Sequence, residues 1–495
     1  MRTNRFLNGL MENDNYTLTE NGAVTHKSTL SGVMDMFSLG GAYRNRSAED
    51  KLSLFIKAFE EDRLLAMKCL FYMRDIRGGQ GEREFFRVCF RWVAKNYPDI
   101  ARKNLALISE YGRYDDMWIS TFETPVQDDT LKFIKDLLTL DVDCKAPSLL
   151  AKWLPSENAS SAKTKHNARV IKNYLGMSSK QYRKTLSFLR ERINVLERLM
   201  SAGEWDKIEF DKIPSKAGFK YRNAFARRDM IAKKYEKFAK DTTTKVNAKT
   251  LYPYECVQEA RKLYRAGVDN VDRLMVNKYW ANLADYFAGK TFNGMAIVDT
   301  SGSMTWGQGI TPIDVAVSLG LYCADKAAGP FHNHFMTFES TPHMVEVRGA
   351  DFVDKVRNVM RANWGGSTNV EAAMDTILYT AIDNHCSQDE LPQNLIIISD
   401  MEFNSCVSSA RYGGGMATLF ERIESKFKMH GYKMPNVVFW NVNARQDNIP
   451  MKVKDGVTLV SGFSPVVYEM IMSGKTGFDL MLEKLNSDRY AAITV

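Results

Sequence analysis

The chain has 495 residues, of which 45% are hydrophobic and 25% charged, and its formal net charge is +8. This balance is typical of a globular protein and excludes a disordered tail, a collagen or a mucin-like stalk. Seven cysteines without a CxxC pair favour reduced thiols over a disulfide framework or a zinc ribbon. No run of about 18 apolar residues and no signal-like N-terminus occur. We therefore expect a soluble, cytoplasmic protein of two or three domains without a membrane partner.

The first thirty residues are polar and indicate no element, whereas the next part of the chain has helical periodicity. Leu52, Phe55, Ile56 and Phe59 recur at the spacing of one helix face. Further helices are predicted at residues 130–140, 148–153, 161–175, 178–202, 224–239, 253–266 and 270–287. Because each has one apolar stripe, each needs a neighbour on that face. We expect antiparallel helix pairs that stack as a solenoid or close into a ring.

Lysine and arginine are concentrated in one segment of this helical part. Residues 163–240 contain 21 Lys and Arg against 8 Asp and Glu, a net charge of +13, which leaves −5 for the rest of the chain. Such a concentration is typical of a protein that binds a polyanion. Aromatic residues that could stack on unpaired bases lie among the charges: Tyr174, Tyr182, Phe188, Trp205, Phe219, Tyr221, Phe225 and Tyr235. The alternative is that these aromatics form the helix core and that the cations only face solvent.

Beyond residue 290 short strands alternate with helices. Strands are predicted at residues 294–298, 331–338, 344–347, 395–398, 437–441 and 457–460. Helices are predicted at residues 312–326, 351–362, 370–384, 417–429 and 465–472. This alternation predicts an α/β, doubly wound, mostly parallel sheet of Rossmann-like type. In such sheets ligands bind at the carboxyl ends of the strands.

Oxygen-bearing side chains follow the predicted strands at those ends. Asp299, Ser301 and Ser303 come directly after the first of these strands, Thr368 precedes a helix, and Asp400 follows the fourth strand. Carboxylates and hydroxyls are hard ligands that suit Mg²⁺ or Mn²⁺. The sequence therefore predicts a magnesium or manganese site at this edge of the sheet.

Other chemistry fits this pattern less well. The turn after Asp299 could cap a helix without an ion, although capping needs only one oxygen. A phosphatase of the haloacid dehalogenase type needs a second Asp at the position that Ser301 occupies. A two-metal nuclease built on Asp299, Asp400 and Glu402 would need several direct carboxylates about 4 Å apart, and here hydroxyls dominate. We therefore expect no catalysis at this site.

The pieces DTSGS, GGSTN and IISD, in that order, resemble the metal-ion-dependent adhesion site of von Willebrand factor A domains. The resemblance covers residues 291–474. It implies that Ser301, Ser303 and Thr368 bind the ion directly and that the two carboxylates act mainly through water. It also implies an open coordination position for an acidic group of a protein partner. The second piece departs from many relatives, because it reads Gly-Gly-Ser-Thr rather than Gly-Gly-Thr.

The helical part resembles the TROVE module of Ro autoantigen proteins in four segments: FYMRDIRGGQGER at 71–83, EYGRYDD at 110–116, LAKWLP at 150–155 and YRKTLSFLR at 182–190. The better match is a related family without an assigned function that occurs in viruses, phages, plants and fungi. In Ro proteins a HEAT-like ring is joined to a von Willebrand A domain and binds single-stranded RNA ends and small structured RNAs. The resemblance thus implies RNA as a partner. Candidate RNA contacts are Lys152, Lys163, Lys165, His166, Arg169, Lys172, Arg183, Lys184 and Arg190.

The whole sequence predicts a multidomain protein. We expect an N-terminal extension at 1–30, an all-α HEAT-like domain at 31–290, the α/β domain at 291–474 and a C-terminal segment at 475–495 that packs back on the body. The leading hypothesis is a non-enzymatic, Ro-like ribonucleoprotein component that binds RNA through its basic helices and a partner through the metal site. The alternatives are a metal-dependent protein-interaction scaffold without RNA and, with less support, a metal-dependent nuclease.

Overall fold

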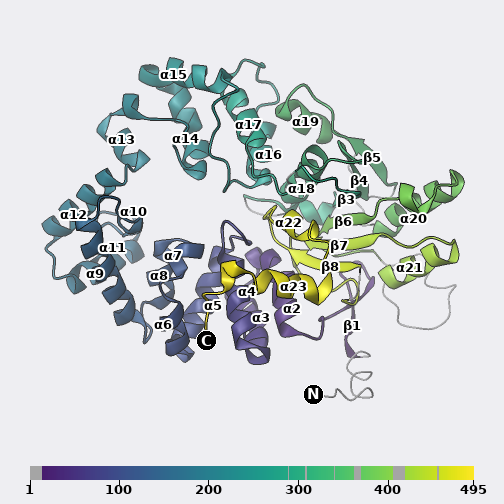
Figure 1. Cartoon of the computed structure of the whole chain (residues 1–495), viewed down its shortest axis with the longest axis horizontal. Coiled ribbons are helices and arrows are strands. Elements are labelled where there is room, and N and C mark those ends of the chain that lie inside the picture. The colour runs from purple at the N-terminus through teal and green to yellow at the C-terminus, as the bar shows by residue number, and fades with distance from the viewer. Residues whose placement is uncertain are drawn as a thin grey trace. The chain divides into compact units, whose positions relative to one another are not determined.

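The computed structural model describes residues 14–287, 289–306, 309–338, 341–361, 369–404, 419–453 and 456–495. Backbone contacts divide the chain into two compact units (Figure 1). We call the first, Met1–Asp62 with Leu251–Ser487, the sheet unit, and the second, Arg63–Thr250 with Asp488–Val495, the helical unit. The domain boundary predicted at residue 290 thus falls inside the sheet unit.

The sheet unit is built on six strands in the order β5-β4-β3-β6-β7-β8. The strands are β3 Gly294–Asp299, β4 His334–Phe338, β5 His343–Glu346, β6 Asn394–Ser399, β7 Asn436–Asn441 and β8 Val457–Ser461. All neighbours pair in parallel except β4 and β5, which are antiparallel. β3 and β6 lie in the middle and are almost entirely buried, which explains their continuous apolar sequences. The predicted parallel-rich sheet in the C-terminal part is confirmed.

Helices cover both faces of this sheet. They are η3 Gly302–Thr305, α18 Pro312–Lys326, α19 Phe352–Val359, α20 Val370–Asp383, η4 Gln388–Glu390, α21 Leu419–Met429, α22 Val467–Ile471 and α23 Gly477–Leu485. Adjacent residues of β7 point to opposite faces. Phe439 packs on Phe420 of α21, with ring centroids 4.5 Å apart. Trp440 packs on Tyr468 of α22 at 5.0 Å, and Tyr322 of α18 stacks on the same ring. Therefore α18 and α22 lie on one face and α21 on the other.

Several helices from the predicted 31–290 domain also belong to the sheet unit. They are α2 Gly32–Leu39, η1 Gly40–Asn45, α3 Ala48–Glu61, α16 Pro253–Lys262 and α17 Val271–Ala281. Trp280 of α17 stacks on Phe352 of α19 with centroids 4.0 Å apart. The Gly41 N–H donates to the Ser461 hydroxyl at 3.0 Å, and a Cβ at Gly41 would lie 2.8 Å from the Ser461 carbonyl oxygen. Glycine is needed for this close approach, which joins η1 to β8.

Two short strands precede these helices, in a region whose polar sequence predicts no element. β1 Tyr16–Leu18 and β2 Val24–His26 pair antiparallel. The turn between them contains Asn21-Gly22, a dipeptide common in hairpins. Gly22 forms a bridge with Asn404 and His26 forms one with Ile449. The hairpin is therefore part of the sheet unit.

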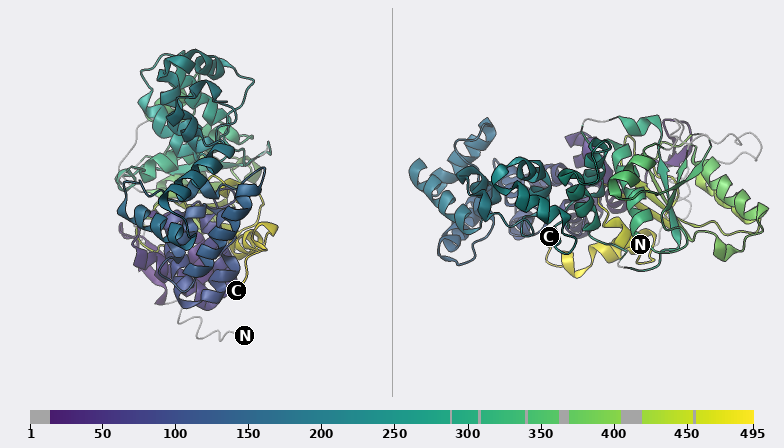
Figure 2. Two further views of the ribbon diagram at one scale, coloured as in Figure 1. Left: turned by 90° about the vertical axis from the view of Figure 1, so that its left-hand side faces the viewer. Right: turned by 90° about the horizontal axis from the view of Figure 1, so that it is seen from above.

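The helical unit contains helices and no strand, and all of its residues are described (Figures 1 and 2). Its elements are α4 Arg63–Arg74, α5 Arg83–Asn96, α6 Pro98–Asn104, α7 Ile108–Tyr111, α8 Tyr114–Thr121, α9 Gln127–Asp143, α10 Leu150–Trp153, α11 Ala162–Tyr174, α12 Ser179–Arg192, α13 Leu196–Ala202, η2 Trp205–Lys207, α14 Ser215–Arg227, α15 Asp229–Lys240 and η5 Asp488–Tyr490. Packing runs mostly between helices that are close in chain order, such as α4 with α5. The prediction of a mostly helical first part is confirmed. Among the helices that the structure describes, none is both long and apolar enough to cross a membrane.

Two predicted helices are interrupted in the structure. The helix predicted at 178–202 is divided into α12 and α13, because Asn194 between them has a left-handed backbone with φ of 49°. The helix predicted at 224–239 falls on α14 and α15, which Arg228 separates with an extended backbone. Short interruptions leave the apolar spacing almost unchanged, so hydrophobic periodicity did not reveal them.

The predicted C-terminal segment is shared between the units. In the sheet unit, α23 packs on β8 and on α2. In the helical unit, η5 packs on α4. The two halves of the segment predicted at 475–495 therefore have different partners.

Candidate metal centre and basic helical surface

Two neighbouring central strands bring the predicted carboxylates to one edge of the sheet. β3 and β6 pair in parallel with Val298 opposite Ile398. Asp299 ends β3, and Asp400 directly follows β6. Both carboxylates are almost fully buried. The structure therefore places the first and last pieces of the predicted site side by side.

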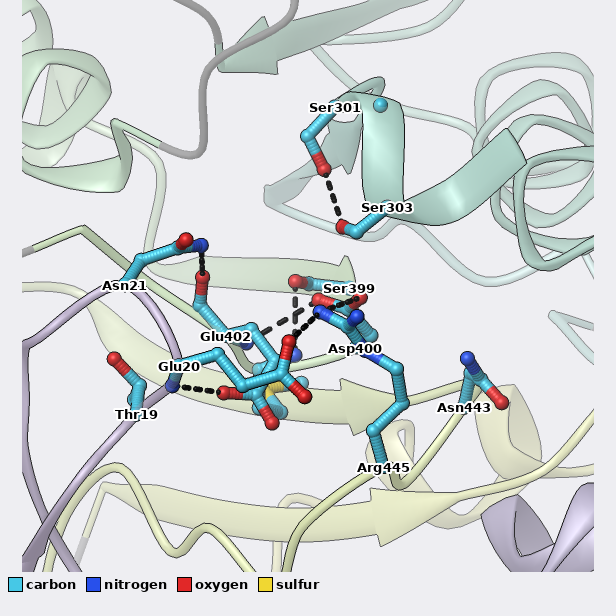
Figure 3. A network of polar contacts seen from close by, with 12 residues as sticks. Thr19, Glu20, Asn21, Ser301, Ser303, Ser399, Asp400, Glu402, Asn443 and Arg445 are labelled. Carbon is cyan, nitrogen blue, oxygen red and sulfur yellow. Dashed lines mark hydrogen bonds and ion pairs between the residues drawn. The ribbon is translucent and has the colours of Figure 1, made fainter. Parts of the chain in front are cut away.

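The Asp299 carboxylate is fixed from both strands. Its Oδ1 accepts a hydrogen bond from the Ser301 backbone N–H at 2.9 Å, and its Oδ2 accepts one from the Ser399 hydroxyl at 2.5 Å. The Ser301 and Ser303 hydroxyls lie 3.0 Å apart (Figure 3). Ser301 precedes η3, but its side chain caps no backbone N–H of that helix. The helix-cap interpretation of this turn therefore lacks support.

Asp400 has one carboxylate oxygen without a hydrogen-bond donor. Its Oδ1 accepts a hydrogen bond from the Glu402 backbone N–H at 3.2 Å. The buried Oδ2 has no hydrogen bond within the described part of the chain, and a guanidinium nitrogen of Arg445 lies 3.4 Å from it. Leaving a charged oxygen buried without a close donor is costly unless another group binds it.

These two buried carboxylates repel each other, and a cation would relieve that repulsion. Burial, and after it the charge of Asp400, raises the pKa of Asp299. Burial also raises the pKa of Asp400, against the opposing charge of Arg445. Two carboxylates with two serine hydroxyls form the hard oxygen set that Mg²⁺ and Mn²⁺ prefer. The residues present at this edge therefore fit the predicted ion.

Thr368, the remaining piece of the predicted site, lies outside the described residues. The next residue, Asn369, caps α20 by accepting a hydrogen bond from the Ala372 N–H at 3.1 Å. In the part of the chain that the structure describes, no group of three or more His, Cys, Asp or Glu side chains is arranged to hold a metal. A cation at this edge would therefore depend on the serine hydroxyls as well as on the carboxylates.

The N-terminal hairpin contributes residues to this site that sequence reasoning missed. The Glu20 N–H donates to Glu402 Oε2 at 2.7 Å, and the Asn21 side chain donates to the Glu402 carbonyl at 2.5 Å. The Glu20 carboxylate pairs with Arg445 at 2.8 Å, and the same guanidinium faces Asp400 (Figure 3). The Asn-Gly turn signals a hairpin, but its docking position is 382 residues away along the chain.

Glu402 is held by internal partners. One of its carboxylate oxygens accepts from the Glu20 N–H, and the other accepts from the Asn448 side chain at 2.8 Å. Burial raises the pKa of Glu402 to about 7. Because both oxygens are engaged, the geometry offers no support for Glu402 as an additional metal ligand of a nuclease.

The predicted RNA contacts lie on three consecutive helices of the helical unit. Lys152 lies on α10, Lys163, Lys165, His166, Arg169 and Lys172 on α11, and Arg183, Lys184 and Arg190 on α12. The exposed ones are Lys163, His166, Arg169, Arg183 and Lys184. Asn167, Ala168 and Ile171 form the buried side of α11, so its charged residues face away from the core.

Lys172 and Arg190 are held by partners on neighbouring segments. Lys172 pairs with Glu157 at 3.0 Å. Arg190 donates to the carbonyls of Ala151 and Leu154, each at 2.9 Å. Both side chains stabilise the packing of these helices, which leaves the exposed residues as the better candidates for contact with phosphate.

Most of the interleaved aromatic residues belong to the core. Tyr182, Trp205, Phe219, Phe225 and Tyr235 are buried. Tyr174 and Phe188 are 40% and 48% exposed, and Tyr221 is half-buried. The interpretation of these aromatics as helix core therefore holds for most of them, and three keep surface that a base could contact.

Two family models match this chain. The one described as Domain of unknown function (DUF2828) matches residues 19–142 and 146–290, and the one described as Domain of unknown function (DUF7788) matches residues 293–491. "Uncharacterized protein L728" of Acanthamoeba polyphaga mimivirus is 33% identical over 504 residues, which cover 93% of this chain and 85% of that protein. These matches agree with the predicted resemblance to a family without an assigned function.

Among solved structures, the crystal structure of the Deinococcus radiodurans RO (RSR) protein is similar with a TM-score of 0.46 and 14% identity. The alignment covers 92% of this chain and 99% of that one. The first family model matches more than half of the chain, and the mimivirus protein aligns with nearly all of it. This chain therefore belongs to the family described as Domain of unknown function (DUF2828).

Proposed function

We propose that this protein binds RNA through the exposed basic residues of α11 and α12. The observation that carries the proposal is the net charge of +13 on residues 163–240. Lys163, Arg169 and Lys184 are exposed and have no carboxylate partner in the part of the chain that is described. Cations that protein carboxylates do not neutralise can bind phosphates and displace their counterions.

The same proposal includes the domain types, the kind of RNA and the cellular role that the sequence resemblance implies. The stacked helices act as a HEAT-like platform, and the sheet domain is of the von Willebrand A type. The RNA is a single-stranded end or a small structured RNA, and the protein is a cytoplasmic, non-enzymatic component of a ribonucleoprotein. Support comes from the packing of the helical unit, from the strand order of the sheet, and from exposed cations on one side of α11.

Charge reversal on the basic helices tests the proposal. The variant Lys163→Glu/Arg169→Glu/Lys184→Glu is expected to weaken the binding of single-stranded RNA at least about tenfold, because three attractive contacts with phosphate become repulsive. Fluorescence anisotropy with a labelled oligonucleotide and a labelled hairpin measures the affinities.

A matched control separates local contacts from net charge. Lys132→Glu/Lys135→Glu/Lys145→Glu makes the same change in charge at exposed positions on α9 and just after it. This control should bind RNA almost as well as the wild type. Equal losses in the two triple variants would show that only net charge matters and would contradict a binding surface on α11 and α12.

We further propose that the Asp299–Asp400 edge of the sheet binds Mg²⁺ or Mn²⁺, as a contact point for an acidic group of a protein partner. The bound ion would supply the positive charge that attracts that group. Support comes from the buried Oδ2 of Asp400, which lacks a hydrogen bond among the described residues and faces an Arg445 nitrogen at 3.4 Å. Further support comes from the Ser301 and Ser303 hydroxyls, which lie 3.0 Å apart on the turn after Asp299. Hydrogen bonds from the Ser301 backbone N–H and the Ser399 hydroxyl hold the Asp299 carboxylate in place.

Titration calorimetry with Mn²⁺ tests the metal site directly. Ser303→Ala removes one hydroxyl ligand and should weaken Mn²⁺ binding more than about tenfold. Ser318→Ala is a matched control, because this buried hydroxyl donates to the Val315 carbonyl at 2.8 Å within α18. Absence of Mn²⁺ binding in the folded wild type, or equal affinities in both variants, would contradict the site. If RNA binding fails while Mn²⁺ still binds, partner capture at the metal site becomes the favoured function.

A further inference from the structure

A cavity of about 700 Å³ opens among four helices of the helical unit. These helices are α10, α12, α13 and α14, which Figure 1 labels. We call the space between them the α10–α14 cavity. Its volume is in the range of small-ligand pockets, roughly 300–1,000 Å³. Five basic side chains and a single acidic one line it: Lys152, Arg190, Arg198, Lys216 and Lys220, and Glu197. This excess of positive charge around a hollow favours an anionic ligand.

Two aromatic side chains, Trp153 and Tyr221, belong to the same lining. The Arg113 guanidinium lies over the Trp153 ring, 4.0 Å from its centroid. The Lys220 ammonium lies over the Tyr221 ring at 4.9 Å. Aromatic rings bind bases by stacking, and cations beside them bind phosphate. A ligand with both an aromatic body and a negative charge therefore matches this lining better than inorganic phosphate does.

The walls of the cavity are fixed by hydrogen bonds between helices. Arg190 of α12 donates to two carbonyls in and just after α10. The Tyr221 hydroxyl of α14 donates to Glu197 of α13 at 3.3 Å. Arg198 pairs with Glu191 at 3.2 Å and with Glu204 at 3.5 Å, but its buried Nε has no acceptor among the described residues. An oxygen of a bound anion would satisfy that donor.

We propose that the α10–α14 cavity binds one nucleoside phosphate, with its base against Tyr221 and Trp153 and its phosphate held by Lys152, Arg198 and Lys220. The nucleotide comes either from an unpaired position of a bound RNA or from the free nucleotide pool. The first source rests on the proposed RNA binding, and the second does not.

Titration calorimetry of the full chain with AMP and with inorganic phosphate tests this site. AMP should bind, and inorganic phosphate should bind much more weakly because it has no base to stack. Tyr221→Ala should weaken AMP binding roughly tenfold, which is about 1.4 kcal/mol. Tyr221→Phe keeps the ring and removes only the 3.3 Å bond from its hydroxyl to Glu197. It should therefore retain most of the AMP affinity that Tyr221→Ala loses, which separates loss of stacking from loss of folding.

Two further variants are matched controls. Tyr379→Ala removes an aromatic ring that is 46% exposed on α20, and Lys132→Ala removes an exposed cation on α9. Neither should change the affinity for AMP. Lys220→Ala, by contrast, should weaken AMP binding roughly tenfold, because it removes a phosphate contact. Equal affinities for AMP and inorganic phosphate, or equal AMP affinities of Tyr221→Ala and Tyr379→Ala, would overturn the proposal of a free-nucleotide site.

Single-stranded RNA distinguishes the two sources. If Tyr221→Ala weakens RNA binding more than Tyr379→Ala does, the cavity holds a nucleotide of the RNA. If it weakens only AMP binding, the cavity holds a free nucleotide. A third outcome is that AMP does not bind and that Tyr221→Ala leaves RNA binding unchanged, while charge reversal at Lys163 and Arg169 abolishes RNA binding. This outcome would overturn the cavity proposal alone. AMP binding without any RNA binding would overturn the proposed function and leave the cavity as a nucleotide site.

Discussion

Asp75, a fully buried carboxylate just after α4, joins η5 to the helical unit. Its oxygens accept hydrogen bonds from the Arg489 guanidinium at 2.7 Å and from the Tyr490 hydroxyl at 3.0 Å. The Arg77 backbone N–H donates to the same carboxylate at 2.9 Å. One side chain therefore satisfies donors from two segments that are more than 400 residues apart.

Asp75→Ala is expected to lower the free energy of unfolding by about 3 kcal/mol, because it leaves the Arg489 charge without its carboxylate partner and leaves the Tyr490 hydroxyl with only the Gly78 carbonyl at 3.3 Å. Asp99→Ala is the control, since this exposed carboxylate pairs with Arg102 three residues further on and should cost less than about 0.5 kcal/mol. Urea unfolding followed by circular dichroism measures both values. Equal unfolding midpoints would show that Asp75 does not hold η5 in place.

The sequence predicts the positions of some residues of the candidate metal site but not of others. Asp299 and Asp400 directly follow two buried apolar strands, so their meeting at one sheet edge follows from the parallel pairing alone. Glu20 and Arg445 lie in no recognisable motif. Arg445 follows β7 and pairs with both Asp400 and Glu20. Glu20 reaches Arg445 because the N-terminal hairpin docks on the loop after β6, and no local signal in the sequence encodes that docking.

At the scale of elements, the break between α12 and α13 depends on one exposed residue. Asn194 has φ of 49°, a conformation that most L-residues adopt only with strain. Asn194→Ala should therefore lower the free energy of unfolding by about 1 kcal/mol. Asn194→Gly should leave it within about 0.5 kcal/mol, because glycine adopts this conformation readily. Thermal unfolding of both variants checks this, and an Asn194→Ala protein as stable as the wild type would refute it.

Elements with a start signal and an apolar run could be predicted closely. The helix predicted at 312–326 coincides with α18, which has Thr311 as its N-cap and Pro312 at its first position. The interrupted helices have weaker signals at their breaks. Asn194 can end a helix because asparagine tolerates the left-handed conformation, but it stands within an apolar helical pattern. Arg228 is an ordinary helix residue and gives no local sign of a break.

At the scale of the whole molecule, the two proposed binding functions reside in different compact units. The basic residues 163–240 belong to the helical unit, and the candidate metal centre belongs to the sheet unit. The charge excess could be predicted because composition requires no knowledge of the fold. The assignment of α2, α3, α16 and α17 to the sheet unit could not be predicted, because an apolar helix face does not specify which partner will cover it.

The salt dependence of RNA affinity shows whether the cations of α11 and α12 contact phosphates. Each phosphate that a cation neutralises contributes about −0.7 to the slope of log K against log salt for a single strand. The four exposed cations Lys163, Arg169, Arg183 and Lys184 therefore predict a slope of about −3 for the wild type. A slope of this size would support electrostatic binding of RNA by α11 and α12. Affinity that hardly changes between low and high salt, or no binding of RNA by the folded protein, would contradict it.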